Sequence, residues 1–127
     1  MTLEEFNSKY VYKTDKDKFG FIEVWEVPEL QEDGKYYGDC ESYCLFLKKN
    51  VPEFKDWELY FCKINGNGHC ILYKDKNVID CNIKSVVSFS NYSKIYRVSE
   101  FSRYNKFTIV SKLLVSKVVL WFRSWTN

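Results

Sequence analysis

The sequence predicts an α+β fold in which one helix, with a cysteine in its first turn, packs against an antiparallel β-sheet. First, Gly38 and Asp39 form a turn and a helix N-cap before a helix-compatible run, which favours a helix that begins at about Cys40. Second, the segment Gly66–Asp80 has the pattern of a strand, a tight turn and a second strand. Third, 127 residues with 46% hydrophobic content suffice for one compact domain, residues 1–127, and are too few for two.

The elements expected before this helix are short. Thr2–Tyr10 predicts a helix with a capping box at its start. The polar segment Val11–Gly20, in which lysines and aspartates alternate, predicts an exposed loop. Phe19–Val27 has an imperfect strand-like alternation, and Pro28–Gln31 predicts a single helical turn.

The middle of the chain predicts two neighbouring strands. The central helix should stop before Val51, and Pro52–Trp57 favours one further helical turn. Glu58–Ile64 predicts a strand, and the glycines and asparagines of 65–68 predict a hairpin turn. This turn delivers His69 to the start of the next strand, at one end of the sheet.

The last third of the chain is less clearly patterned. Ser85–Phe89 and Lys94–Val98 predict two more short strands, joined at Ser90–Ser93, that complete the sheet. Phe107–Trp125 is apolar but interrupted by basic residues, and its β-branched residues leave open a helix or a strand followed by a helix. It is too short and too charged to span a membrane. It either seals the sheet or forms an exposed surface that binds a partner.

Cys40 is the candidate nucleophile. At the first turn of a helix, unpaired backbone N–H groups and the positive end of the helix dipole favour a thiolate, so the thiol pKa is expected to fall toward neutrality. A thiolate can attack a carbonyl carbon, but it also needs a base and a group that orients this base.

His69, the sole histidine, is the candidate base. If Lys74 pairs with Asn77 across the tight turn, His69 lies directly opposite Asn82 and diagonal to Asp80, with all three on one face of the sheet. A carboxylate at this position can hold the neutral imidazole in one tautomer and leave the other ring nitrogen to take a proton from Cys40. Asp80 is the first choice for the orienting residue, and Asn82 is the alternative.

Four motifs in this order carry a family resemblance. They are Trp25-x-x-Pro28, Gly38-Asp39-Cys40-Glu41-Ser42-Tyr43, Gly68-His69-Cys70-Ile71-Leu72 and Val78-Ile79-Asp80. In order and spacing they resemble the transglutaminase-like cysteine peptidases of bacteria and phages, over about residues 25–82. The resemblance implies a papain-like core with Cys40 as nucleophile, His69 as base and Asp80 as orienting residue.

The same resemblance implies roles for two residues outside the triad. The family pattern places Trp25 beside the cleft near the nucleophile, and a core or lid aromatic is the alternative. Papain-like enzymes place a glutamine upstream of the cysteine as an oxyanion donor, so Gln31 is a candidate beside the backbone N–H of Cys40. Ser42 stands where the family usually has Asp, which argues against the calcium dependence of some longer relatives.

These residues together predict cysteine-dependent acyl transfer on a protein or peptide substrate. A thioester formed on Cys40 gives a peptidase, amidase or deamidase if water resolves it, and a transglutaminase if an amine does. The resemblance favours the hydrolase, a thiol protease with a catalytic triad. No cofactor is expected.

Two alternatives stay open. One is a cell-wall peptidase of the NlpC/P60 type, which has a similar Asp-Cys opening but usually a histidine where this chain has Asp80. The other is a catalytically silent protein that keeps the fold and binds a host factor. The abundance of lysine, asparagine and aromatic residues and the absence of alanine fit a viral protein from an AT-rich bacteriophage genome.

Composition argues against several other classes. A net charge of +2 with interspersed acids and lysines gives no basic stripe for nucleic acid. Five cysteines without framework-like spacing favour reduced thiols over disulfides, and a zinc site would need closer cysteine pairs and more histidine. The acidic start has no signal-peptide pattern, so a cytoplasmic location is expected, in the host cytoplasm if the protein is phage-encoded. The oligomeric state is left open.

Overall fold

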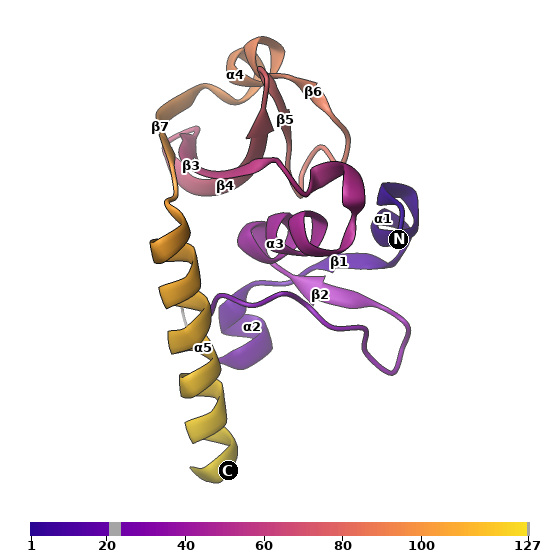
Figure 1. The fold of residues 1–127 in the computed structure, drawn as a ribbon, viewed down its shortest axis with the longest axis vertical. Coiled ribbons are helices and arrows are strands. Elements are labelled where there is room, and N and C mark those ends of the chain that lie inside the picture. The colour runs from indigo at the N-terminus through magenta and orange to yellow at the C-terminus, as the bar shows by residue number, and fades with distance from the viewer. Residues whose placement is uncertain (21–23, 127) are drawn as a thin grey trace.

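A computed structural model describes residues 1–20 and 24–126, and these residues form an α+β fold. The main layer is a five-stranded antiparallel sheet with the strand order β6-β5-β4-β3-β7. Figure 1 shows helix α3 (Cys40–Asn50) between this sheet and a small pair of parallel strands, β1 (Tyr10–Tyr12) and β2 (Tyr36–Gly38). The predicted α+β class, with an antiparallel sheet against which the cysteine-bearing helix packs, is confirmed.

The N-terminal segment is more regular than predicted. Helix α1 (Leu3–Lys9) is capped by the Thr2 side chain, as expected, and leads directly into β1. The predicted exposed loop at Val11–Gly20 is wrong, because this segment contains the end of β1 and a short helix α2 (Asp15–Phe19). Asp15 is only 4% exposed, and its carboxylate accepts the backbone N–H of Val24 at 2.6 Å.

The segment before β2 has little regular structure. Of the strand expected over Phe19–Val27, residues 21–23 lie outside the described residues and residues 24–27 are not in a strand. The backbone N–H groups here bond side chains instead of a neighbouring strand: the Asp15 carboxylate accepts the N–H of Val24, and the hydroxyl of the distant Ser116 accepts the N–H of Trp25 at 2.8 Å. The helical turn predicted at Pro28–Gln31 is also wrong, because the chain reverses in a turn after Gln31, whose N–H bonds the carbonyl of Lys35.

The central elements agree with the sequence. The Asp39 side chain caps α3 by accepting the N–H of Ser42, and a 3₁₀ turn, η1 (Pro52–Phe54), follows the helix. Strand β3 (Glu58–Ile64) pairs with β4 (Asn67–Lys74) across a turn at Asn65-Gly66, so the hairpin predicted over 65–68 forms with a shorter turn, and Asn67 and Gly68 already belong to β4. Strand β5 (Asn77–Ile79) follows the predicted turn at Asp75-Lys76.

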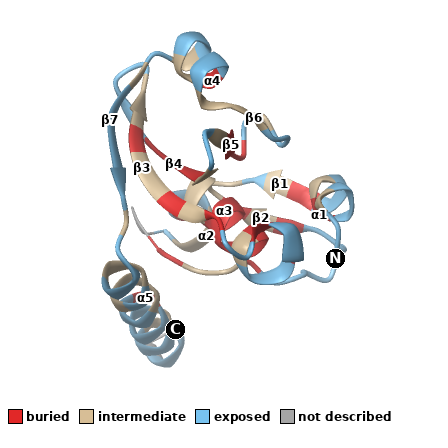
Figure 2. Cartoon of the chain, turned by 45° about the horizontal axis from the view of Figure 1, so that its top comes forward, coloured by how far each residue is buried: buried red, intermediate tan, exposed pale blue. Residues whose placement is uncertain are grey.

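The core lies where α3 packs against β4 and against the N-terminal elements. Figure 2 shows the buried residues concentrated in α3, the central strands and the small β1-β2 layer. Phe6 of α1 is fully buried and stacks on Phe46 of α3 with 4.0 Å between ring centroids. The Cys44 thiol lies within 3.6 Å of the Cys70 carbonyl of β4. This packing fixes the start of α3 near the start of β4.

The last third differs from the prediction. Strand β6 (Val87–Ser88) covers only part of Ser85–Phe89. The expected turn and strand over 90–98 are wrong, because helix α4 (Phe89–Tyr96), capped by the Ser88 side chain, occupies this segment. Strand β7 (Val98–Arg103) then pairs with β3 at the sheet edge.

The C-terminal segment is one long helix, α5 (Lys106–Thr126). It does not seal the sheet, and in Figure 1 it stands beside the domain and extends past α2. None of the helices in residues 1–20 and 24–126 combines the length and apolar composition needed to cross a bilayer.

Candidate active site

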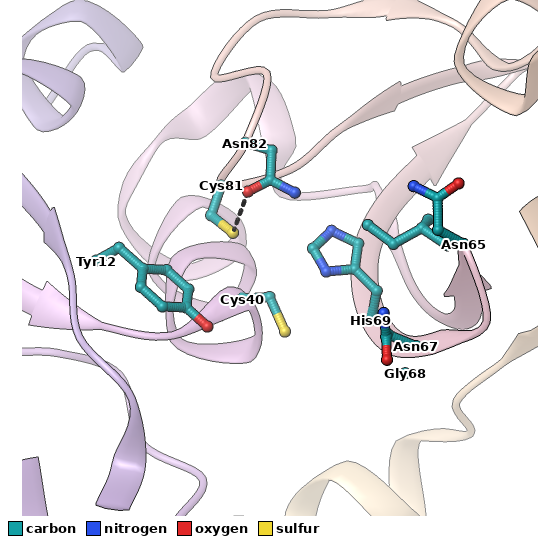
Figure 3. Close-up of a pocket in the computed structure, with 9 residues that line it drawn as sticks. Tyr12, Cys40, Asn65, Asn67, Gly68, His69, Cys81 and Asn82 are labelled. Atoms are coloured by element: carbon teal, nitrogen blue, oxygen red, sulfur yellow. Dashed lines mark hydrogen bonds between the residues drawn. The ribbon is translucent and has the colours of Figure 1, made fainter. Parts of the chain in front are cut away.

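A pocket of about 280 Å³ lies between the start of α3 and the start of β4. Figure 3 shows Cys40 and His69 on facing walls of this pocket, with Tyr12 beside Cys40. The residues that line it are Tyr12, Cys40, Ile64, Asn65, Asn67, Gly68, His69, Cys81 and Asn82. The structure thus brings the candidate nucleophile and the candidate base to one pocket.

Cys40 is the first residue of α3, directly after the cap residue Asp39. It is the one partly exposed cysteine, because the other four are buried. Its thiol donates a hydrogen bond to Oε2 of Glu41 at 3.3 Å. The start of α3 thus places the sulfur of Cys40 in the pocket, where the carboxyl group of Glu41 accepts its hydrogen bond.

The acidic surroundings of Cys40 change the expected electrostatics. Burial, followed by the charges of Glu41 and Asp39, raises the pKa of the Cys40 thiol well above its ordinary value. The prediction of a lowered thiol pKa is therefore wrong for the free protein, because burial first, and then the charges of Glu41 and Asp39, oppose the effect of the helix dipole. Burial and the charge of Asp39 likewise raise the pKa of Glu41 to about 8.

His69 lies on β4 and is 8% exposed. Its Nε2 is 2.7 Å from Oδ2 of Asp80, which is fully buried. Because an ionised carboxylate only accepts hydrogen bonds, this contact keeps a proton on Nε2 and leaves Nδ1 as the free nitrogen of the neutral ring. The structure thus brings His69 and Asp80 together, as predicted.

The predicted register, with Lys74 opposite Asn77, is confirmed, but it does not continue as far as Asp80. The pairing of β4 with β5 ends at Leu72 and Ile79, so the predicted pair of His69 with Asn82 does not form. The chain instead turns at Asp80, whose Oδ1 accepts the backbone N–H groups of Asn82 at 2.9 Å and Ile83 at 2.8 Å. Asn82 lines the pocket, but Asp80 is the residue bonded to the imidazole.

Tyr92 is a component of the site that sequence reasoning missed. It is fully buried on α4, and its hydroxyl donates to Oδ2 of Asp80 at 2.6 Å. Burial alone would raise the pKa of Asp80, but hydrogen bonds from His69, Tyr92 and the N–H of Ile83 outweigh it and lower this pKa. This contact was missed because the segment of α4 was expected to be a turn and a strand.

The two remaining candidates lie outside the pocket. Trp25 is 2% exposed and contacts Tyr104 and Ser116, so it is a core residue and does not line the cleft. Gln31 is exposed, and its amide donates to the carbonyl of Glu29. Neither residue lines the pocket. Tyr12 does line it, and Tyr12 was missed because it lies on β1, in a segment that was predicted to be a loop.

Direct contact between the thiol and the imidazole is not made in this conformation. Among the described residues, the sulfur of Cys40 bonds Glu41, and His69 bonds Asp80. Within the same residues, no group of three or more histidine, cysteine or acidic side chains is arranged to hold a metal ion. The chemistry available here is that of a thiol, an imidazole, carboxyl groups and a phenol.

Comparisons with known proteins add no family assignment. No protein-family model matches the chain, and no curated protein matches its sequence significantly.

Proposed function

We propose that this protein is a cysteine-dependent acyl-transfer enzyme that hydrolyses carboxamide or peptide bonds of a protein or peptide substrate. One observation carries the proposal: an imidazole held at 2.7 Å by a buried carboxylate shares a pocket with the one partly exposed cysteine, at a helix N-terminus. In this proposal Cys40 is the nucleophile, His69 the base and Asp80 the orienting residue.

The reaction begins from the thiol. Rotation about the Cα–Cβ bond of Cys40 exchanges the hydrogen bond to Glu41 for one to Nδ1 of His69. His69 takes the proton as the sulfur attacks the carbonyl carbon, the new C–S bond forms, and the carbonyl electron pair moves onto oxygen. Collapse of this intermediate breaks the C–N bond, and the amine leaves with the proton from His69. Water, deprotonated by His69, then cleaves the thioester to a carboxylic acid and restores the thiol.

Two groups beside Cys40 can bind the oxyanion. The backbone N–H of Cys40 is at the first residue of α3, where helix geometry leaves it without an intrahelical acceptor. The Tyr12 hydroxyl points into the pocket beside Cys40 (Figure 3), so Tyr12 replaces Gln31 as the proposed side-chain donor. Partial burial, with the charge of Cys40 next, raises the pKa of Tyr12 to about 12, which keeps the phenol protonated.

The proposed family is that of the transglutaminase-like cysteine peptidases on a papain-like core. Support comes from the order of the motifs and from a cysteine at the start of a helix that packs on an antiparallel sheet carrying the histidine. The carboxylate at Asp80 favours this family over the NlpC/P60 type, which usually has a histidine there. A bacteriophage origin remains a proposal from composition.

A peptide-cleavage experiment tests the proposal. Wild-type protein and Cys40→Ala are incubated with a mixed peptide library and a fluorescent primary amine, and mass spectrometry detects new termini, deamidated glutamine and amine adducts. We expect mainly new termini or deamidation with wild type and none with Cys40→Ala. Cys81→Ala is the matched control, since it removes another thiol of the same pocket and should keep activity. Products that persist in Cys40→Ala, or none from folded wild type, would contradict the proposal.

One observation favours the second candidate, a silent protein that binds a host factor. The thiol pKa is raised and the thiol bonds a carboxyl group instead of the base. This candidate predicts that wild type forms no product in the peptide experiment although it is folded.

A further inference from the structure

Helix α5 is attached to the domain along one side only. Ile109 and Leu113 pack against the main core, and the Ser116 hydroxyl, on a residue that is 8% exposed, binds the N–H of Trp25. The ammonium of Lys112 lies 5.0 Å from the centre of the Trp25 ring. This side therefore mixes apolar and polar contacts and is fixed to the protein.

The opposite side of α5 is apolar and faces solvent. At 100° per residue its large side chains fall within a sector of about 140°, in which Ser111 is the polar member. Figure 2 shows the helix mainly exposed along its length. The members of this apolar band are Phe107, Val110, Leu114, Val115, Val118, Trp121, Phe122 and Trp125, which are 81%, 54%, 58%, 61%, 53%, 56%, 61% and 75% exposed.

The charge of α5 has one sign. The sequence from Lys106 to Trp125 contains four basic residues and no acidic residue. Lys106 and Lys117 are exposed and fall at one edge of the apolar band. Charge complementarity therefore favours a partner surface that is apolar within and anionic at its edge.

A phospholipid surface fits this description better than a second helix. A paired helix covers a narrow seam of its partner, whereas the interface of a bilayer can cover the full width of the band. A second copy of α5 would also bring no acidic residue to Lys106 and Lys117. Trp121 and Trp125 suit the interface because the indole ring combines an apolar body with a polar N–H group.

We propose that α5 docks this protein on an anionic phospholipid surface. The apolar band lies in the boundary between headgroups and acyl chains, the helix axis runs along the surface, and Lys106 and Lys117 contact lipid phosphates. Ser116 and Trp25 keep the opposite side of the helix on the domain, so the helix lies on the membrane and does not cross it.

Vesicle co-sedimentation of the full chain tests this docking. The probes are phosphatidylcholine vesicles with and without one quarter phosphatidylglycerol, at low and high salt. We expect binding to the anionic vesicles at least about tenfold tighter than to the neutral ones, and weaker at high salt. No binding to anionic vesicles, or equal binding to both kinds, would overturn the proposal.

Two variants and a control locate the contact. Leu114→Asp combined with Val118→Asp should reduce binding at least about tenfold, because it places charges inside the apolar band. Ile95→Asp is the control, since Ile95 is 69% exposed on α4, away from α5, and should bind like wild type. Lys106→Glu with Lys117→Glu should abolish the preference for anionic lipid.

Circular dichroism is used to check that each variant is folded before its vesicle binding is compared with wild type. Unchanged vesicle binding by the double aspartate variant would overturn the proposal. A different result would also overturn it: wild type is a dimer in analytical ultracentrifugation, the double aspartate variant is a monomer, and neither protein binds vesicles. The apolar band would then be covered by a second copy of the chain.

Discussion

Asp80 joins three separate parts of the chain at one carboxyl group. Its Oδ2 contacts His69 of β4 and Tyr92 of α4, and its Oδ1 accepts two backbone N–H groups of the following turn. These contacts lower the pKa of Asp80 despite its burial, so the ionised form that orients the imidazole is the stable one.

Tyr92→Phe should weaken this carboxylate site. The variant keeps the ring but removes the 2.6 Å hydrogen bond, so we expect the free energy of unfolding to fall by about 1.5–3 kcal/mol. The pKa of Asp80 should rise, because one bond to its charged form is lost, and carbon NMR of the carboxyl group measures this. Tyr96→Phe, on the same helix, is the control. An unchanged pKa of Asp80 would show that Tyr92 has only a packing role.

After burial, Glu41 is the largest contributor to the raised pKa of the Cys40 thiol. Its charge raises the pKa of the thiol, but its own pKa of about 8 means that this charge develops only as the pH rises through that value. At pH 6 Glu41 is protonated, so Glu41→Gln should change the alkylation rate of Cys40 little. Above pH 8 the variant removes a negative charge, and the rate should rise by about tenfold or more, because each unit by which the thiol pKa falls increases the thiolate fraction tenfold. A ratio of rates that stays constant from pH 6 to 9 would contradict this role.

At the scale of elements, the start of α3 depends on a close approach that only glycine permits. A Cβ atom on Gly38 would lie 2.5 Å from Cβ and 3.0 Å from Oγ of Ser42 in the first turns of the helix. The Gly-Asp-Cys sequence thus has a steric reason as well as a capping one, since Asp39 caps the helix that presents Cys40.

Gly38→Ala should lower the free energy of unfolding by about 1–3 kcal/mol through this overlap. Gly68→Ala is the matched control, because its nearest contact, Cε2 of Phe61, lies at an ordinary 3.5 Å. Urea unfolding followed by fluorescence compares the two. Equal effects of both changes would show that the close approach to Ser42 does not matter.

Elements specified by local signals were predicted from the sequence. The Asp39 cap, the turn at Asp75-Lys76 and strand β3 depend on neighbours within a few residues. Elements that depend on distant partners were not, because Ser116 binds the backbone of Trp25 from ninety-one positions away and no local pattern indicates this bond. The triad candidates follow from the motif order and from the hairpin at Asp75-Lys76, whereas Tyr92 lies on a helix that was expected to be a turn and a strand, so its contact with Asp80 was missed.

At the scale of the whole molecule, buried acids should make stability depend on pH. Burial, with the nearby Asp39 carboxylate, raises the pKa of Asp15 to about 7, although the N–H of Val24 acts in the opposite direction. The unfolded chain releases this proton near pH 4, so the folded state binds more protons between about pH 4 and 7. The contribution of Asp15 to the free energy of unfolding is therefore fully present below about pH 4 and is lost as the pH rises through about 7.

Asp15→Asn should reduce this pH dependence. Asp15 should contribute a loss on the order of 1 kcal/mol per pH unit between pH 5 and 7, and the variant should lack this contribution, because its amide does not titrate and still accepts the N–H of Val24. Urea unfolding at pH 5, 6, 7 and 8 measures both slopes. Parallel slopes would show that Asp15 is ionised in the folded protein at all four values.

The central claim is that His69 acts as a base toward Cys40, and pulse alkylation measures this directly. Iodoacetamide adducts are mapped at each cysteine, but selectivity for Cys40 alone is not decisive, because the other four cysteines are buried. The decisive quantity is the rate at Cys40 in His69→Ala relative to wild type, with Asn67→Ala as a control on the same pocket wall. We predict a decrease of at least about tenfold for His69→Ala and little change for Asn67→Ala. Equal rates at Cys40 in wild type and His69→Ala would contradict the account.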